Sequence, residues 1–461
     1  MAILSAYALP HPPLAVPGVG RGQEKEIKKT IEAFAEVSKE IARLKPETIV
    51  FITPHNVLYS DYFHISPGES ASGDFARFRA AGITLKTRYD TKLAGEIARL
   101  AEQSGIPAGF MGEREANLDH GVTVPMWFIN SEYDGYMSVR ISQSGLDQAE
   151  HYKLGQHIAE AAEKLDRKTA LIASYDLSHK LKGDGPYGYA PEGPEFDEEV
   201  IRLLSVGDFL SLMKMSETFR ERAAECGYNS LMVMAGCLDG KQTDARVLSY
   251  EGPYGVGYAV ASFTPGKPDK NRDFLRQYNE CLISAAVKAR DSEDCYRALA
   301  RSSLESRVIN GEELPLPDGL PGELYSSKAG VFVSLHKNGR LRGCIGTIAP
   351  TTSCVASEII QNAVSAGLND NRFAPVTASE LPHLTYKVDV LSAPEAISGP
   401  EALDVKRYGV IVTSGRRRGL LLPNLEGVDT VDEQIGIARK KAGIQEGAPV
   451  TLERFEVIRH E

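Results

Sequence analysis

The sequence predicts two domains, an α/β domain followed by an α+β domain, and three observations point to them. The chain has 461 residues, more than a single hydrophobic core usually serves. Up to about residue 264, apolar strand segments alternate with helical segments, which is typical of an open sheet with helices on both faces. Beyond that point, short segments of alternating polarity joined by tight-turn residues indicate an antiparallel sheet with helices.

Strands and helices alternate through the first domain. Residues 2–9 and 47–55 have the apolar character of strands, and the uninterrupted apolar run at 49–52 suggests burial on both faces. Between them, apolar side chains recur every three or four residues over 27–44, which predicts an amphipathic helix. The same alternation returns over 154–174. Ligands of such sheets bind at the carboxyl ends of the strands, so we look there for a site.

The second domain contains three well-marked signals. Asn338 and Gly339 lie between two short strand-like segments, the strongest short-range signal for a β-hairpin. Residues 384–391 alternate between apolar and polar side chains, as a half-buried strand does. Thr430 and Glu433 have the spacing of a capping box and predict the start of a helix.

The segment between the two patterns, residues 265–272, predicts an exposed linker because it combines two prolines, a glycine and charged residues. We therefore expect domains at residues 1–264 and 273–461. The net charge of −10 falls almost entirely in the first, which argues against nucleic acid as its partner. The sequence shows no long apolar run, no leader and no C-x-x-C pair among its six cysteines. These features predict a cytoplasmic protein without membrane contacts and with reduced thiols.

Four histidines of the first domain stand where an apolar run gives way to a loop: His11, His55, His120 and His179. Each one alone is readily structural, but four at equivalent positions suggest a site. Imidazole is the usual nitrogen ligand for divalent metals and the usual base near neutral pH. Asp176, three residues before His179, either fixes the tautomer of that histidine or belongs to a structural turn.

Five motifs of the first domain resemble the LigB-type fold of class III extradiol ring-cleaving dioxygenases, and more closely the Memo family that shares it. They are YALPHPPL, ITPHN, LDHGV, SYDLSH and ECGYNSLMVMAG, and the resemblance covers nearly all of residues 1–264. It implies that His11 and His55 bind a transition metal, and that His120 and His179 are catalytic acid–base groups or additional ligands. It also implies a metal-dependent oxidoreductase that acts on a small aromatic or phenolic molecule.

The third metal ligand is open between two neighbours, Glu225 and Cys226. A carboxylate at this place would complete a two-histidine, one-carboxylate triad suited to Fe(II), whereas a thiolate favours Zn(II) or Cu(I). Adjacent side chains point in different directions, so we expect only one of them to face the metal, and we favour Cys226. The alternative is that neither residue binds a metal and the pair begins a helix, with Glu225 near the positive end of the helix dipole and Cys226 in the core. Fe(II) is the ion expected for a catalytic site.

The motifs GRLRGCIGT, DNRFAPVT and GLLLPN resemble the AMMECR-type domain from about Asn271 to the end of the chain. The fusion of both domains is similar to the AmmeMemoRadiSam family, whose name implies a radical S-adenosylmethionine partner protein. A possible second site contains Arg342 and Cys344, which share one strand face, and Arg372 as an anion contact. A neighbouring cation can lower a thiol pKa, although we favour a packed hydrophobic cysteine, and a structural arginine is at least as good an interpretation of Arg372.

Three functions are consistent with the sequence. The first is the oxidoreductase described above. The second is a metal-binding or redox partner protein of the Memo type without turnover of its own. The third is an enzyme that modifies a macromolecule presented by the second domain. The acidic first domain argues against a nucleic-acid substrate, whereas a thiolate ligand favours the metal-binding partner.

Overall fold

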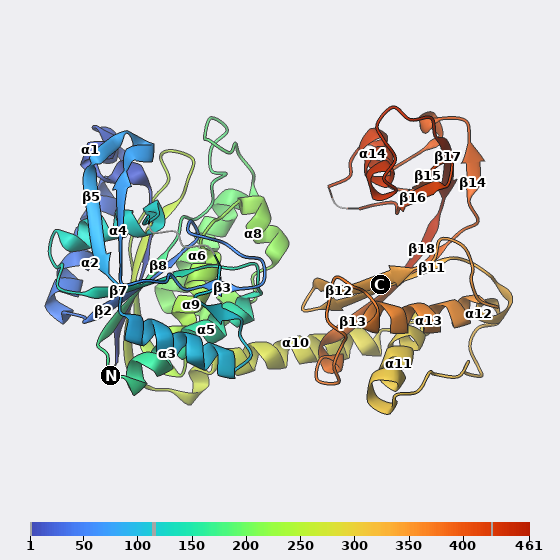
Figure 1. Ribbon diagram of the computed structural model, residues 1–461, viewed down its shortest axis with the longest axis horizontal. Coiled ribbons are helices and arrows are strands. Elements are labelled where there is room, and N and C mark those ends of the chain that lie inside the picture. Colours follow the sequence, from blue (N-terminus) through green and yellow to red (C-terminus); the bar gives the residue numbers. More distant parts are fainter. Residues whose placement is uncertain (1, 113–116, 426) are drawn as a thin grey trace. The chain divides into compact units, whose positions relative to one another are not determined.

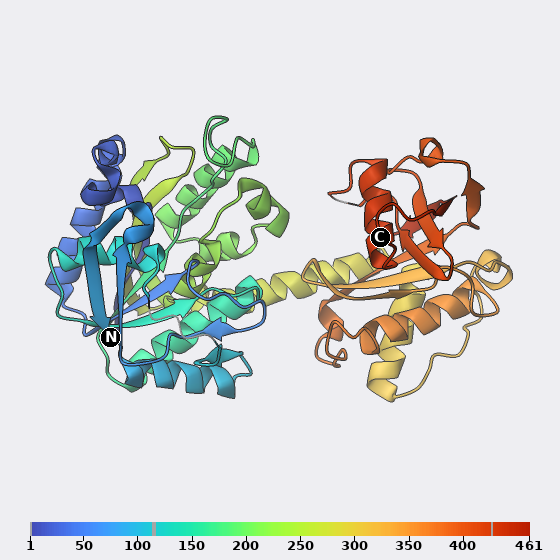
Figure 2. The ribbon, with the colours of Figure 1, turned by 45° about the horizontal axis from the view of Figure 1, so that its top comes forward.

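A computed structural model describes residues 2–112, 117–425 and 427–461 of the chain (Figures 1 and 2). The chain divides into two compact units, Met1–Asn279 and Glu280–Glu461. The first is an α/β unit and the second an α+β unit, as the sequence predicts. Among the described residues, none of the helices combines the length and apolar character needed to cross a membrane.

The first unit is built on a six-stranded mixed sheet. Its strands, in spatial order, are β7 (Met137–Ser142), β2 (Thr48–Thr53), β8 (Thr169–Ser174), β1 (Ile3–Leu9), β10 (Tyr258–Pro268) and β9 (Lys241–Glu251). The first four are parallel to one another, and β10 and β9 continue the sheet in antiparallel pairing. All residues of β2 and β8 are buried, because helices cover both faces of the sheet.

Helices α2 and α4 cover one face of this sheet, and α5 and α9 cover the other (Figure 1). The predicted stripe of α2 is confirmed, since Phe34, Val37 and Ile41 are buried against apolar side chains of β1, β2 and α4. The helices of this unit are α1 (Pro17–Gly20), α2 (Lys28–Leu44), α3 (Thr91–Gln103), α4 (His120–Asn130), α5 (Gln148–Lys164), α6 (Glu192–Val206), α7 (Phe209–Met213), α8 (Glu217–Ala223) and α9 (Tyr228–Cys237).

Smaller strands lie outside the main sheet. A hairpin of β4 (Ser70–Phe75) and β5 (Ala80–Arg88) is joined by a 3-10 helix at Ala76–Phe78. The short strands β3 (Phe63–His64) and β6 (Ala108–Gly109) pair in parallel. The turn that connects the two strands of this hairpin borders the pocket described below.

Residues 265–272 are ordered secondary structure, which differs from the expected linker. Strand β10 continues through Pro268 and pairs with β9, and a 3-10 helix follows at Lys270–Arg272. Strand β1 pairs with β10 only as far as Phe263, so both prolines lie where β10 has a neighbour on one side, a position that tolerates proline. Helix α10 (Phe274–Asp291) then contains the boundary between the units.

The second unit contains two antiparallel four-stranded sheets. One has the order β12 (Arg340–Gly346), β11 (Val331–Lys337), β13 (Leu384–Leu391) and β18 (Val457–His460). The other has the order β14 (Glu395–Ile397), β17 (Thr451–Phe455), β15 (Gly409–Ser414) and β16 (Arg417–Leu421). Its remaining helices are α11 (Cys295–Asn310), α12 (Gly322–Ser326), α13 (Val355–Leu368) and α14 (Val431–Lys441).

Two local sequence signals of the second unit are present in the structure. Asn338 and Gly339 connect β11 to β12 with positive φ angles of 56° and 81°, as a type I′ hairpin turn requires. Thr430 and Glu433 form the capping box at the start of α14. Helices α11 and α13 pack on the sheet of β11 and form the main core of this unit.

Candidate metal centre

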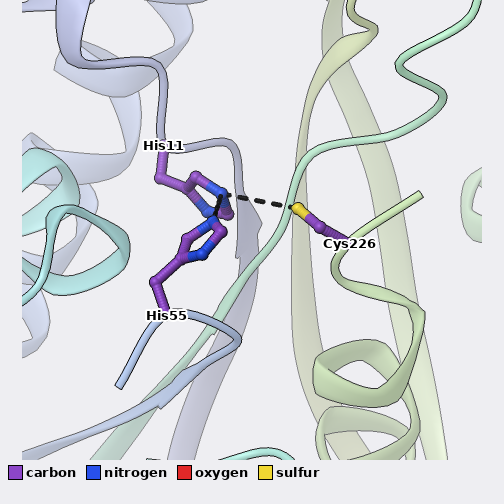
Figure 3. Close-up of side chains that lie close together, drawn as sticks. All are labelled: His11, His55 and Cys226. Atoms are coloured by element: carbon purple, nitrogen blue, oxygen red, sulfur yellow. Dashed lines mark hydrogen bonds between the residues drawn. The ribbon is translucent and has the colours of Figure 1, made fainter. Parts of the chain in front are cut away.

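The parallel strands β1, β2 and β8 end at the same edge of the sheet, and the predicted histidines follow them there. His11 comes two residues after β1, His55 two residues after β2, and Asp176 two residues after β8. Cys226 approaches from another direction, just before α9. Figure 3 shows the two imidazoles turned toward each other, with the Cys226 sulfur directed at His11.

Three donor atoms converge in this place. The Nε2 atoms of His11 and His55 are 2.9 Å apart, and the Sγ atom of Cys226 is 3.5 Å from Nε2 of His11. All three atoms lie within 4.8 Å of one another, in a geometry that could hold one ion. Two ring nitrogens at such a distance either share one proton or direct both lone pairs at a cation. Two imidazoles and a thiolate are ligands that transition ions prefer.

Hydrogen bonds on the far side of the imidazole fix the tautomer of His11, which is 1% exposed. Nδ1 of His11 lies 2.9 Å from the hydroxyl oxygen of Ser174, and that hydroxyl donates its proton to the carbonyl of Gly121 at 2.5 Å. Ser174 has a single proton to donate, so its oxygen accepts from Nδ1–H of His11. Nε2 is therefore left with a free lone pair that faces His55 and Cys226, as a ligand nitrogen must.

The structure brings Cys226, and not Glu225, to the two histidines. Oε2 of Glu225 accepts the backbone N–H of Tyr228 at 2.6 Å, and its other oxygen lies 3.9 Å from the guanidinium of Arg220. Glu225 thus satisfies a free N–H at the start of α9 and faces away from the site. Gly227 keeps the turn tight, because a Cβ there would lie 2.0 Å from Cβ of Tyr175.

Asp176 and His179 form a second donor group that shares Cys226 with the first. The ligand atoms of these three residues also lie within 4.8 Å of one another. One oxygen of Asp176 accepts the backbone N–H of His11 at 2.9 Å, and the other is 3.7 Å from Nε2 of His11. The sequence predicts Asp176 as a partner of His179 or as part of a structural turn, and neither prediction includes its contact with His11. The signal was the acidic residue directly after a buried strand.

His120 begins α4 and lies beside the donor group. Its ring stacks on His55 with centroids 4.2 Å apart, and it meets the ring of His11 edge-on at 5.3 Å. His179 completes the second donor group with Asp176 and Cys226, and its ring meets Tyr187 edge-on at 5.1 Å. Both histidines are thus close enough to the donor group to exchange protons with a molecule held there.

A pocket of about 570 Å³ opens beside His55 and His120. Its size is in the usual range for small-molecule sites. The walls come from the loop after β2, the hairpin turn between β4 and β5, and the segment that leads into α4. The lining residues are His55, Asn56, Val57, Asp74, Ala76, Arg77, Phe78, Asn117, Leu118, Asp119 and His120.

Burial and mutual repulsion set the protonation of the group when no cation is bound. Burial, followed by the charges of neighbouring histidines, holds the pKa of His11 well below its usual value and lowers the pKa of His55 to about 4. Burial likewise raises the pKa of the Cys226 thiol well above its usual value and that of Asp176 to about 7. The imidazoles are therefore neutral and free to bind an ion, whose charge would favour the thiolate.

The predicted second-domain residues lie together, but each arginine faces a carboxylate. The guanidinium of Arg372 lies 2.6 Å from Asp370 and donates to the carbonyl of Cys344, and Nε of Arg342 lies 3.0 Å from Glu380. The hydrogen bonds from Arg372 hold the pKa of Asp370 well below its usual value. The charge of Arg372 is thus balanced by Asp370, and an anion-binding role for this arginine stays a prediction.

Comparison with known families agrees with the two-domain fold. Residues 5–261 match the family model of the catalytic LigB subunit of aromatic ring-opening dioxygenase, and residues 297–460 match the AMMECR1 family. The first match covers more than half of the chain. The protein therefore belongs to the LigB family, and its C-terminal part is an AMMECR1 domain.

Individual relatives match the whole chain or part of it. A protein of Clostridium acetobutylicum is 42% identical over 100% of this chain and 99% of its own length. One from Thermotoga maritima is 49% identical over 34% of this chain and 91% of its own length. Among solved structures, an uncharacterized protein from Pyrococcus horikoshii is 31% identical, with a TM-score of 0.33, over 36% of this chain and 88% of its own. One from Escherichia coli K12 is 16% identical, with a TM-score of 0.37, over 56% and 99%.

Proposed function

We propose that the first unit is a metal-dependent oxidoreductase of the dioxygenase type that acts on a small aromatic or phenolic molecule. The observation that carries the proposal is the convergence of Nε2 of His11, Nε2 of His55 and Sγ of Cys226 beside a pocket. These residues would hold the metal, with Asp176 close to the same nitrogen of His11. The LigB family to which the chain belongs supports this class of chemistry.

The chain's own residues would position the substrate and move its protons. A transition ion held here would supply Lewis acidity toward a phenolic oxygen. His120 stacks on His55 at the pocket wall, where burial lowers its pKa to about 4 and keeps the imidazole neutral. Its free lone pair could then accept the phenolic proton once a bound cation had made the phenol more acidic. His179 belongs to the donor group of Asp176 and Cys226, and from there it can return a proton to the product. Apolar side chains such as Phe78 and Leu118 give an aromatic ring a surface to pack against.

A second candidate function follows from the identity of the third donor. Cys226, rather than the carboxylate of Glu225, faces the histidines, and a thiolate favours Zn(II) or Cu(I) over Fe(II). A site of this composition fits a metal-binding or redox partner protein of the Memo type. In either function, a radical S-adenosylmethionine protein is the proposed partner of the full chain.

Metal analysis separates the two candidate functions. The full-length protein is purified without added metal, its metal content is measured, and it is then loaded in turn with Fe(II), Zn(II) and Cu(I). Oxygen uptake by the Fe(II)-loaded protein with a panel of catechols and phenols supports the oxidoreductase. Tight stoichiometric binding of Zn(II) or Cu(I) without oxygen uptake supports the metal-binding partner.

Substitution of the proton-transfer histidines tests the oxidoreductase further. His120→Gln and His179→Gln are expected to keep the metal and to lose most of the oxygen uptake, about 100-fold or more for a general acid–base group. His157→Gln is the matched control, because this histidine lies on α5 and interacts with Glu160. Loss of metal in either variant would instead make that histidine a ligand.

A further inference from the structure

The pocket beside the candidate metal centre carries one fixed positive charge, that of Arg77. This residue lies in the 3-10 helix Ala76–Phe78, at the turn between β4 and β5, and its side chain is exposed. Of the pocket-lining residues that the structure describes, Arg77 alone is an arginine or lysine. A cation placed at the wall of a ligand pocket is a natural contact for an anion.

Each carboxylate of the same pocket has one oxygen in a hydrogen bond with another group. Oδ1 of Asp74 accepts the backbone N–H of Ala76 at 2.8 Å. Asp119 accepts the Thr53 hydroxyl at 2.6 Å and lies 3.7 Å from the guanidinium of the buried Arg140. Within residues 2–112, 117–425 and 427–461, the ion pairs of the chain do not include Arg77. Its charge is therefore available to a bound molecule.

The walls near Arg77 suit an aromatic ring. Phe78 follows Arg77 directly and meets the ring of His120 edge-on, with centroids 5.5 Å apart. Val57 and Leu118 add further apolar surface to the same pocket. A ligand that occupies this space would thus have His55 and His120 at one part of the wall and the guanidinium of Arg77 at another.

We propose that Arg77 determines the specificity of this pocket, by binding an anionic group, carboxylate or phosphate, on an aromatic ligand. This inference rests on the proposed function for the phenolic nature of the ligand and adds the charge that the ligand must carry. Arg77 forms charge-assisted hydrogen bonds with the anion, and its planar guanidinium can bind two oxygen atoms at once. Neutral phenols of the same shape lack this contact and bind more weakly.

The test is a calorimetric titration of the full-length protein with matched ligands. The anionic probes are 4-hydroxybenzoate and phenyl phosphate, and the neutral probe is 4-hydroxybenzyl alcohol. We expect at least one anionic probe to bind about 10-fold more tightly than the neutral one, the effect of one charge-assisted hydrogen bond at a partly exposed site. Raising the ionic strength should reduce this preference.

Two variants assign the preference to its residue. Arg77→Gln should abolish the preference by lowering the affinity for the anionic probes about 10-fold. Arg79→Gln should retain it, because Arg79 lies on the same hairpin but outside the pocket lining. Both substituted side chains are exposed, so the variants should fold, which circular dichroism verifies.

Each outcome decides the matter. Tighter binding of 4-hydroxybenzoate identifies the anionic group as a carboxylate, and tighter binding of phenyl phosphate identifies it as a phosphate. Both results support the proposal. If 4-hydroxybenzyl alcohol binds as tightly as the anions, or if Arg77→Gln keeps the preference, the role of Arg77 is refuted and the phenol pocket stands. If none of the aromatic probes binds the wild-type protein, the phenolic substrate and the role of Arg77 fall together.

Discussion

The hydroxyl oxygen of Ser174 accepts a hydrogen bond from Nδ1–H of His11 at 2.9 Å, and the same hydroxyl donates a hydrogen bond to the carbonyl of Gly121. This pair connects the last residue of β8 to the first loop of the chain. It determines which nitrogen of His11 is free, and it does so before any ion arrives. The His11 imidazole is thereby oriented before a metal binds, which lowers the free-energy cost of ordering this side chain on metal binding.

Ser174→Ala should therefore weaken metal binding although the residue contacts no metal. Without the hydroxyl, His11 can change tautomer and its ring can rotate, and we expect metal affinity to fall about 10- to 100-fold. Ser38→Ala is the matched control, because Ser38 is also a buried serine that donates to a backbone carbonyl, far from the site in α2. Competition titration with a metal chelator measures both; equal affinities in the two variants would contradict the assigned role.

Substitutions at the neighbours Cys226 and Glu225 should affect different properties, metal affinity for Cys226 and stability for Glu225. Cys226→Ser should sharply lower metal affinity and shift the preference away from Zn(II) and Cu(I), since a hydroxyl replaces the soft sulfur donor. Glu225→Gln should keep the metal and lower the free energy of unfolding by about 1 kcal/mol, because it weakens the contact with the N–H of Tyr228. Elemental analysis and urea unfolding measure the two effects. The reverse pattern would make Glu225 the ligand.

Gly227→Ala should destabilise the first unit and displace Cys226. The new Cβ would lie 2.0 Å from Cβ of Tyr175 and 2.4 Å from its Cα, atoms that cannot move without shifting the backbone after β8. We expect a loss of about 3 kcal/mol in the free energy of unfolding, at the upper end for an overpacked site. Gly95→Ala in α3 is the control: nothing lies within 4 Å of its Cβ, so alanine should stabilise the helix by about 1 kcal/mol.

Acid should weaken the second unit through Glu380. Burial alone would raise the pKa of this carboxyl, but hydrogen bonds from Arg342, Thr377 and Lys337 outweigh it and lower the pKa from 4.5 to about 2. A depressed folded-state pKa stabilises the fold above the unfolded-state pKa, and this stability is lost as the pH falls from about 4.5 to about 2. Urea unfolding followed by circular dichroism at pH 5 and pH 3 measures the loss. Glu380→Gln should show a smaller change between these two pH values.

The sequence predicts much of the fold because periodicity and turn chemistry are local. The stripe from Ile27 to Leu44 and the Asn338-Gly339 turn depend only on neighbouring residues, and both appear as predicted. Residues 265–272 were harder to interpret, since their pairing with Lys241 and Thr243 is set by a distant strand. A local composition typical of linkers does not reveal such a partner.

The candidate site shows the same division. The positions of His11 and His55 follow from strand ends, which can be read along the chain. The choice between Glu225 and Cys226 depends on which side chain meets the first free N–H of α9, and that requires the backbone path of the turn. The contact of Asp176 with His11 joins residues 165 positions apart, so local patterns could not predict it.

The donor atoms come from parts of the chain that are far apart, with 215 positions between His11 and Cys226. An ion bound there acts as a cross-link that only the folded first unit can form. At a free ion concentration one hundred times its dissociation constant, such a ligand adds about 2.7 kcal/mol to the stability of the native state. The supply of metal would thus govern how long the protein survives proteolysis. Cells that lack the ion would contain less of the protein, independently of any effect on its activity.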